Sequence, residues 1–114
     1  MCYSDGYYSM VQLDDYVIDV LMRDLVGHDR RPASFLVYLW LAREQRRGAG
    51  PVCASYREIA EAIGVSKSAA QAAVRWLLRR RLIESAKKTV TATPRYRVLS
   101  PWREREARAA QRPK

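Results

Sequence analysis

The chain has few of the residues that bind metal ions or carry out most enzymatic catalysis. Two cysteines, Cys2 and Cys53, and one histidine, His28, occur among its 114 residues. A four-ligand zinc site would therefore need carboxylates, and no acidic residues are spaced for one. The sequence also lacks a Ser-His-Asp, a Cys-His or a phosphate-loop arrangement. We expect a protein that is not an enzyme and binds no cofactor or metal, and we expect Cys53 to be a small buried residue.

Long hydrophobic runs are lacking as well. The longest uninterrupted apolar stretch, Phe35–Ala42, is far too short to cross a bilayer. No basic N-terminal segment leads into an apolar signal sequence. The composition, with 48% hydrophobic and 29% charged residues, is typical of a globular chain. The sequence thus predicts one cytoplasmic domain that has no contact with a membrane.

Acidic residues become scarce after residue 29. The chain has 21 Lys and Arg against 12 Asp and Glu, a net charge of +9. Residues 1–29 carry six acids and one base, which gives −5, so residues 30–114 carry 20 bases and six acids, which gives +14. A basic unit of this kind attracts polyanions, and nucleic acid is the first candidate. The alternative is a solvated basic surface that only aids solubility.

The pattern divides the chain into four parts. We expect a flexible arm over residues 1–12, a helix with an acidic face over residues 13–27, the main domain over residues 30–102, and a basic tail over residues 103–114. Asp14 or Asp15 would cap the N-terminal helix, and Gly27 would end it in a left-handed conformation. Its apolar face would be formed by Val17, Val20, Leu21 and Leu25. The tail is either a short helix or a frayed end.

The main domain reads as helix, short strand, helix, turn, helix and hairpin. The expected elements are Pro32 to about Arg47, Pro51–Ala54, the helix after Ser55, Ser66–Arg81, and strands Ile83–Val90 and Arg95–Leu99. Ser55 and Glu58 form a capping box, Gly64 ends the helix that they begin, and Ser66 caps the next one. Trp40 should lie in the core. The inner face of the last helix should be Ala70, Ala73, Val74 and Leu77.

The segment Val65–Ile83 resembles the recognition-helix region of the GntR- and MarR-type bacterial regulators. Its valine-serine start, buried Ala70, Ala73-Val74 pair, Leu77, and Leu82-Ile83 exit stand at the places that these families use. The run Tyr56–Ala60 resembles their supporting helix, and Arg95–Leu99 their returning wing strand. The resemblance implies a winged helix-turn-helix, mainly α with a small β-hairpin and an extra N-terminal helix. Arg81 stands where the families usually have glycine, which predicts a strained or altered exit turn.

The resemblance and the helical period together indicate which residues would contact DNA. If the inner face of helix 66–81 is buried, Lys67, Gln71 and Arg75 lie on the opposite face. Gln can pair with adenine through two hydrogen bonds, and Arg or Lys with guanine, while Arg75 has phosphate as its alternative partner. Phosphate can also bind at the N-terminus of the helix. The full expected DNA-binding set is Tyr56, Arg57, Ser66, Lys67, Ser68, Gln71, Arg75, Lys87, Lys88, Thr91 and Arg95.

These features predict a sequence-specific double-stranded DNA-binding protein of the nucleoid, a transcriptional regulator with α-helical major-groove recognition and a wing over residues 84–97. Useful affinity argues for a homodimer, for which the N-terminal helix is the candidate interface. Simple packing of that helix on the core is the alternative. Other functions remain open: a plasmid or phage replication or partition accessory protein, and a winged helix that binds only proteins. A winged helix that binds only proteins would need a neutral or acidic outer face on helix 66–81.

Overall fold

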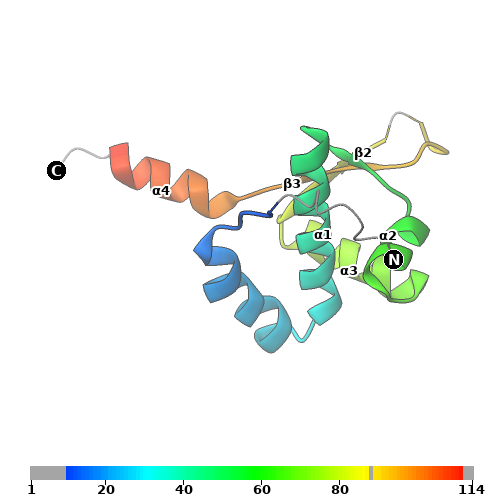
Figure 1. Ribbon diagram of the computed structural model, residues 1–114, viewed down its shortest axis with the longest axis horizontal. Coiled ribbons are helices and arrows are strands. Elements are labelled where there is room, and N and C mark those ends of the chain that lie inside the picture. Colours follow the sequence, from blue (N-terminus) through cyan, green and yellow to red (C-terminus); the bar gives the residue numbers. More distant parts are fainter. Residues whose placement is uncertain (1–9, 88, 112–114) are drawn as a thin grey trace.

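The computed structural model describes residues 10–87 and 89–111, and Figure 1 shows a mainly helical chain with a small antiparallel sheet. The expectation of a mainly α-helical chain with a small β-structure is confirmed. In chain order the elements are η1 (Val17–Leu21), η2 (Arg23–His28), α1 (Pro32–Gly48), β1 (Val52–Cys53), α2 (Tyr56–Ile63), α3 (Lys67–Arg79), β2 (Ile83–Ala86), β3 (Arg95–Val98) and α4 (Pro101–Gln111).

Helix α1 lies at the centre of the fold, where it packs against η2, α2, α3, β1 and β3. Pro32 suits its first turn, because the amide hydrogen that proline lacks would have no helical partner there. Its buried side carries Phe35, Val37, Tyr38 and Leu41, and the buried Ser34 hydroxyl donates to the Ala73 carbonyl of α3 at 3.3 Å. Trp40 was expected in this core but is only partly buried, because its position falls at the edge of that side.

The N-terminal helical segment, η1 and η2 together, has wider turns than an α-helix. The Met22 amide donates to the Val17 carbonyl, five residues back, and similar bonds recur through η2. In a wider helix every fourth residue stays on the same side, so Val17, Leu21 and Leu25 are buried in one row. Val20 was expected on that face and is 39% exposed instead. The α-helical period assumed from the sequence was therefore wrong here.

Both ends of the N-terminal helical segment also differ from expectation. Gly27 does not end it, because the helix continues to His28 and the left-handed residue is Arg30, with φ 55°. Neither Asp14 nor Asp15 caps it through a side chain. The Asp14 carboxylate is occupied elsewhere, by side chains of α4.

The three strands form a sheet in the order β1-β3-β2, with Val52 opposite Tyr96 and Ile83 opposite Val98. The two hairpin strands are shorter than predicted. The chain turns at Thr89–Ala92, so β2 ends at Ala86 rather than at Val90, while β3 begins at Arg95 as predicted and ends at Val98 rather than at Leu99. Alternation along β1 turns Cys53 outward while Ala54 is buried, so the expectation of a buried cysteine was wrong.

Helix α4 projects from the rest of the molecule and is attached by its first turn (Figure 1). Trp102 is only 4% exposed and stacks on Tyr16, with ring centroids 4.6 Å apart. Its indole nitrogen donates to Asp14 at 2.7 Å, and Arg103 binds the same carboxylate at 2.6 and 2.8 Å. The region expected as a tail from residue 103 is thus helical from Pro101 to Gln111. In the described residues no helix is long and apolar enough to span a membrane.

Candidate nucleic-acid interface

The start of α3 is fixed by local hydrogen bonds that the sequence predicts. Ser55 and Glu58 form the capping box of α2, with both bonds at 3.1 Å, and Gly64 ends that helix at φ 82°. The Ser66 hydroxyl then accepts the Ala69 amide hydrogen at 3.1 Å. These caps fix where α2 ends and where α3 begins. Ser66 is therefore engaged as a cap, and its hydroxyl also lies 3.2 Å from that of Ser68.

One face of α3 is buried and the opposite face is open. The inner face, which matches the predicted one, consists of Ala70, Ala73, Val74 and Leu77. Lys67, Ser68 and Arg75 are exposed on the other side, and Gln71 is half-buried there. The small residue Ala72 is also exposed on this face. The open face thus combines long polar side chains with small residues and carries no aromatic side chain.

The polar side chains of this face have no partners within the described part of the chain. Neither Lys67 nor Arg75 forms an ion pair, and the Gln71 amide makes no hydrogen bond, among residues 10–87 and 89–111. Their spacing of four residues places them in one row along the helix. We call Lys67, Gln71 and Arg75 the α3 row. It offers two cations and one amide to a ligand outside the fold.

The basic residues at the C-terminal end of α3 are bound within the protein. Trp76 lies under two guanidinium groups, with Arg31 4.6 Å and Arg79 5.7 Å from its ring centroid. Its indole nitrogen donates to Asp29 at 2.9 Å. Arg80 pairs with Asp24 at 2.7 Å and with Asp29 at 3.5 Å. Asp24 and Asp29 thus offset the charge of Arg80 at this end of α3.

Asp29 is the central acceptor of that cluster, and its side chain is only 5% exposed. Burial raises the pKa of its carboxyl, but hydrogen bonds from His28 and Trp76 and the nearby Arg80 charge outweigh this and lower the pKa. Asp29 is therefore ionised at neutral pH. No local sequence signal could reveal the cluster, since Trp76 and Asp29 are 47 residues apart.

The two expected contact residues of α2 differ in how far their side chains are exposed to solvent. Arg57 is exposed and forms only a weak pair with Glu61, at 3.5 Å. Tyr56 is half-buried and packs on the core beside Tyr96. Burial raises the pKa of Tyr96, and the neighbouring Tyr56 hydroxyl raises it further. Arg57 is thus open to an external anion, whereas Tyr56 is largely engaged in packing.

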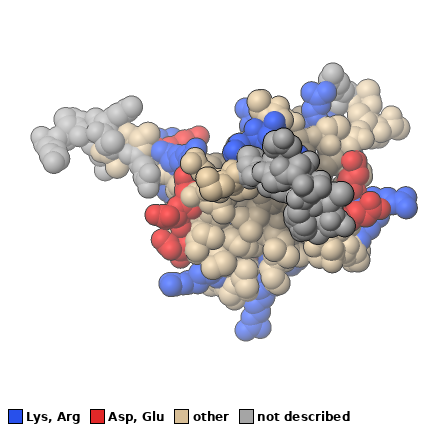
Figure 2. All heavy atoms as spheres, viewed as in Figure 1, with Lys and Arg blue, Asp and Glu red and all other residues tan. Residues whose placement is uncertain are grey.

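The loop between β2 and β3 carries the remaining expected residues. Lys87, Thr91 and Arg95 are exposed, while Lys88 lies outside the described residues. In Figure 1 this loop and the α2–α3 pair lie on the same side of α1, away from α4. Figure 2 shows basic atoms where the end of α1 and the hairpin strands overlap in this view, and acidic atoms both at the edge formed by the N-terminal helical segment and on the side of α2. The hairpin loop and the α2–α3 pair thus lie on one side of the molecule.

Arg81 follows α3 at the exit to β2, and its backbone is left-handed with φ 57°. Its amide donates to the Leu78 carbonyl at 3.1 Å, and the next amide, of Leu82, donates to Leu77 at 3.0 Å. A left-handed backbone costs an L-residue about 1 kcal/mol or more, which glycine avoids. Of the two alternatives expected for the exit turn, a strained or an altered one, the left-handed backbone of Arg81 supports the strained one.

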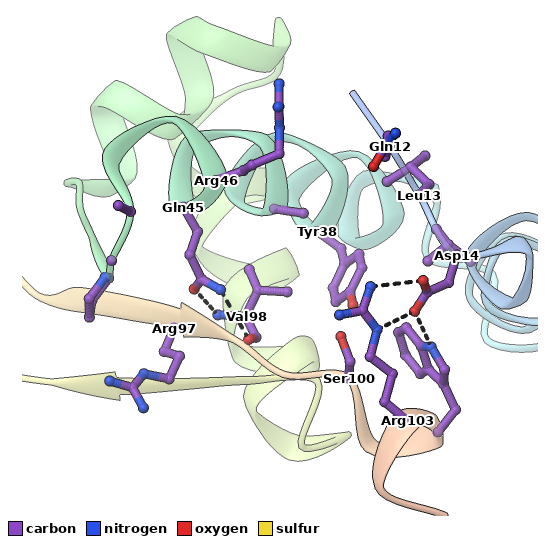
Figure 3. Close-up of a pocket in the computed structure, with 16 residues that line it drawn as sticks. Gln12, Leu13, Asp14, Tyr38, Gln45, Arg46, Arg97, Val98, Ser100 and Arg103 are labelled. Atoms are coloured by element: carbon purple, nitrogen blue, oxygen red, sulfur yellow. Dashed lines mark hydrogen bonds and ion pairs between the residues drawn. The ribbon is translucent and has the colours of Figure 1, made fainter. Parts of the chain in front are cut away.

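A cavity of about 630 Å³ lies between α1, β3, residues 12–14 and the start of α4 (Figure 3). Several of its polar groups hold the fold together. Gln45 accepts the Val98 amide hydrogen at 2.7 Å, and the Tyr38 hydroxyl donates to the Leu99 carbonyl at 3.0 Å. Figure 3 shows Asp14 and Arg103 pointing toward one another. No group of three His, Cys, Asp or Glu residues that could hold a metal ion occurs in the part of the chain that the structure describes.

Comparison with known proteins gives no relative. No family model matches the chain, and neither a curated protein nor a solved structure is significantly similar to it. A function must therefore be inferred from the chain's own side chains.

Proposed function

We propose that this protein is a winged helix-turn-helix protein that binds double-stranded DNA in a sequence-specific manner. In this proposal α2, its turn and α3 form the helix-turn-helix, and the β2–β3 hairpin is the wing. The order of elements, with β1 pairing at the outer edge of β3, supports the assignment. Helix α3 would enter the major groove, as recognition helices of this class do.

The α3 row is the observation that carries the proposal. Three unpartnered side chains capable of hydrogen bonding to bases lie on the open face of one helix, among serine and alanine. Gln71 would bind adenine and Arg75 guanine, each through two hydrogen bonds. The small size of Ser68 and Ala72 would let the helix backbone come close to the base edges. Had the row been acidic or neutral, a protein partner would be favoured instead.

Other expected residues would position the protein on the duplex. Lys67, Ser68 and the free amides at the start of α3 would bind a phosphate. Arg57, at the start of α2, would bind another. In the wing, Lys87, Thr91 and Arg95 would contact phosphates or the adjacent minor groove. These contacts add affinity and fix the register but carry little sequence information.

The biological role that fits best is a transcriptional regulator that acts by occupying its site in the cytoplasm, on the nucleoid. One such module reads about half of a typical operator, so a homodimer on a repeated or palindromic site would give the usual affinity.

A selection from a random-sequence duplex pool, repeated at several salt concentrations, tests the proposal. We expect an enriched motif and an affinity that falls steeply as salt rises. Arg75→Ala should reduce affinity for the motif by about 5- to 150-fold, which corresponds to the loss of one good base contact of about 1–3 kcal/mol.

Arg108→Ala is the matched control, because it removes the same charge from an exposed position on α4, far along the chain from α3. It should leave the motif intact. Enrichment of no motif would contradict sequence-specific recognition, and no binding at low salt would contradict DNA binding altogether. Equal losses in Arg75→Ala and Arg108→Ala would contradict the assignment of α3.

A further inference from the structure

The exposed apolar side chains of this protein are concentrated in one region. In the described residues, eight of the nine large exposed hydrophobic side chains lie between residues 10 and 36, and only Val90 lies elsewhere. Four belong to the N-terminal helical segment: Ile18, Val20, Met22 and Val26. Figure 2 shows an extended uncharged area over this segment and the adjoining part of α1. An uncharged area that contains several exposed apolar side chains is typical of a protein–protein interface.

Two rows on this segment are open to solvent, next to the buried row. Ile18, Met22 and Val26, one turn apart, form the outer apolar row and are 45%, 39% and 40% exposed. Asp15, Asp19 and Arg23, also one turn apart, form the charged row. No ion pair involves the charged row within the described residues, whereas Asp14, Asp24 and Asp29 are already bound by arginine or tryptophan.

The charges of the segment restrict what can cover it. Its acidic balance disfavours a nucleic acid and an anionic lipid surface. The charged row is, however, complementary to itself in the antiparallel direction, because its first two members are negative and its last is positive. Two antiparallel copies centred near Met22 would place each Arg23 close to Asp19 of the second copy. The same arrangement would bring the two outer apolar rows face to face, with Ile18 near Val26 of the second copy.

We propose that the N-terminal helical segment is a homodimer interface, in which two copies pack antiparallel about a two-fold axis near Met22. Such an interface is isologous, so each copy contributes the same residues. It buries the outer apolar row at its centre and leaves the charged rows at its rim, which is the usual division of an interface. The dimer would give the proposed DNA reader its two-fold symmetry, but it can be measured without DNA, so the two proposals fail separately.

Sedimentation equilibrium over a range of protein concentrations tests the interface. We expect twice the monomer mass for the wild type and the monomer mass for Met22→Glu. Val90→Glu is the matched control, because it places the same charge on an exposed apolar residue outside the segment, and it should remain dimeric. Circular dichroism checks that each variant is folded. A monomeric wild type, or a Met22→Glu variant that still dimerises, would overturn the proposal.

Charge reversal tests the antiparallel direction. Arg23→Asp makes the charged row wholly negative, and Asp15→Arg with Asp19→Arg makes it wholly positive. Each protein alone should repel its own copy, with the dimer dissociation constant raised at least tenfold. An equimolar mixture should form heterodimers, since the rows are then opposite in sign. A mixture that remains monomeric would overturn the antiparallel pairing, and neither variant could restore dimers by mixing if it were simply unfolded.

Discussion

The indole nitrogen of Trp76 on α3 donates to Asp29 at 2.9 Å, and thereby joins the proposed recognition helix to the acidic segment that precedes α1. Asp29 also forms an ion pair with Arg80 at 3.5 Å, and its side chain is almost fully covered. The position of α3 thus depends on a carboxylate that lies outside both α3 and the helix before it.

Asp29→Ala should lower the free energy of unfolding by about 1–3 kcal/mol, because it leaves a half-buried indole N–H without its acceptor and removes the longer of the two ion pairs of Arg80, which keeps Asp24. Urea denaturation followed by tryptophan fluorescence measures the loss. Glu104→Ala, on the exposed face of α4, removes the same kind of charge and should change stability by less than about 0.5 kcal/mol. Equal effects of the two substitutions would contradict a structural role for Asp29.

Asp14 predicts a dependence of stability on acid pH. Hydrogen bonds from Arg103 and Trp102 lower the pKa of Asp14 from 3.8 to about 2. Since the folded pKa lies below the unfolded one, the ionised carboxylate stabilises the fold fully above about pH 4, and this contribution is lost as the pH falls toward 2. Thermal melts between pH 2 and pH 6 measure it. In Asp14→Asn this part of the dependence should disappear, and an unchanged profile would show that the contact is absent in solution.

Arg81→Gly should stabilise the fold. Glycine removes the left-handed strain of about 1 kcal/mol but loses more backbone entropy on folding, so we expect a net gain of a few tenths to about 1 kcal/mol. The control is Arg81→Ala, which removes the same charged side chain and keeps the strain, and it should give no gain. The denaturant midpoints of the wild type and of the two variants measure these differences in stability. A lower midpoint for Arg81→Gly than for the wild type would contradict the presence of strain at this residue.

If the proposed function is correct, Gln71→Ala should relax the sequence preference at one base pair. The loss of two hydrogen bonds to a base should cost about 1–3 kcal/mol on the preferred duplex and very little on unrelated duplexes. Lys67→Ala should instead weaken binding to all duplexes alike and reduce the salt dependence by about one charge. Competition binding on a panel of single-base variants separates the two patterns. If both substitutions changed the binding of all duplexes in the same way, the assignment of Gln71 to a base and of Lys67 to a phosphate would be contradicted.

Local patterns in the sequence predict the part of the fold that carries the candidate site. The capping pattern at Ser55, Gly64 and Ser66 depends on residues within one turn of each other, so its geometry can be read from the chain. The same holds for the buried face of α3, where a regular helical period selects Ala70, Val74 and Leu77. Whether the α3 row contacts DNA stays a prediction.

The errors lie where distant contacts decide the structure. Asp14 looks like a helix cap within its own segment, but Trp102 and Arg103, almost ninety residues later, take its carboxylate. The helix around Val20 widens its turns, so an α-helical period misplaced one residue of its face. Residue spacing alone predicts neither the Trp76 cluster nor the outer apolar row. Both depend on how the N-terminal helical segment packs against the rest of the fold.

The contact between Asp14 and Trp102 also joins two residues that lie 88 positions apart in the 114-residue chain, and so closes most of it into a loop. Bringing such distant segments together costs more chain entropy than forming a contact between residues that are close in the sequence. The contact should therefore form among the last steps of folding and open among the first in local unfolding. The start of the N-terminal helical segment and the first turn of α4 would then exchange their amide hydrogens together, as one cooperative unit that loosens while α1 and α3 stay closed.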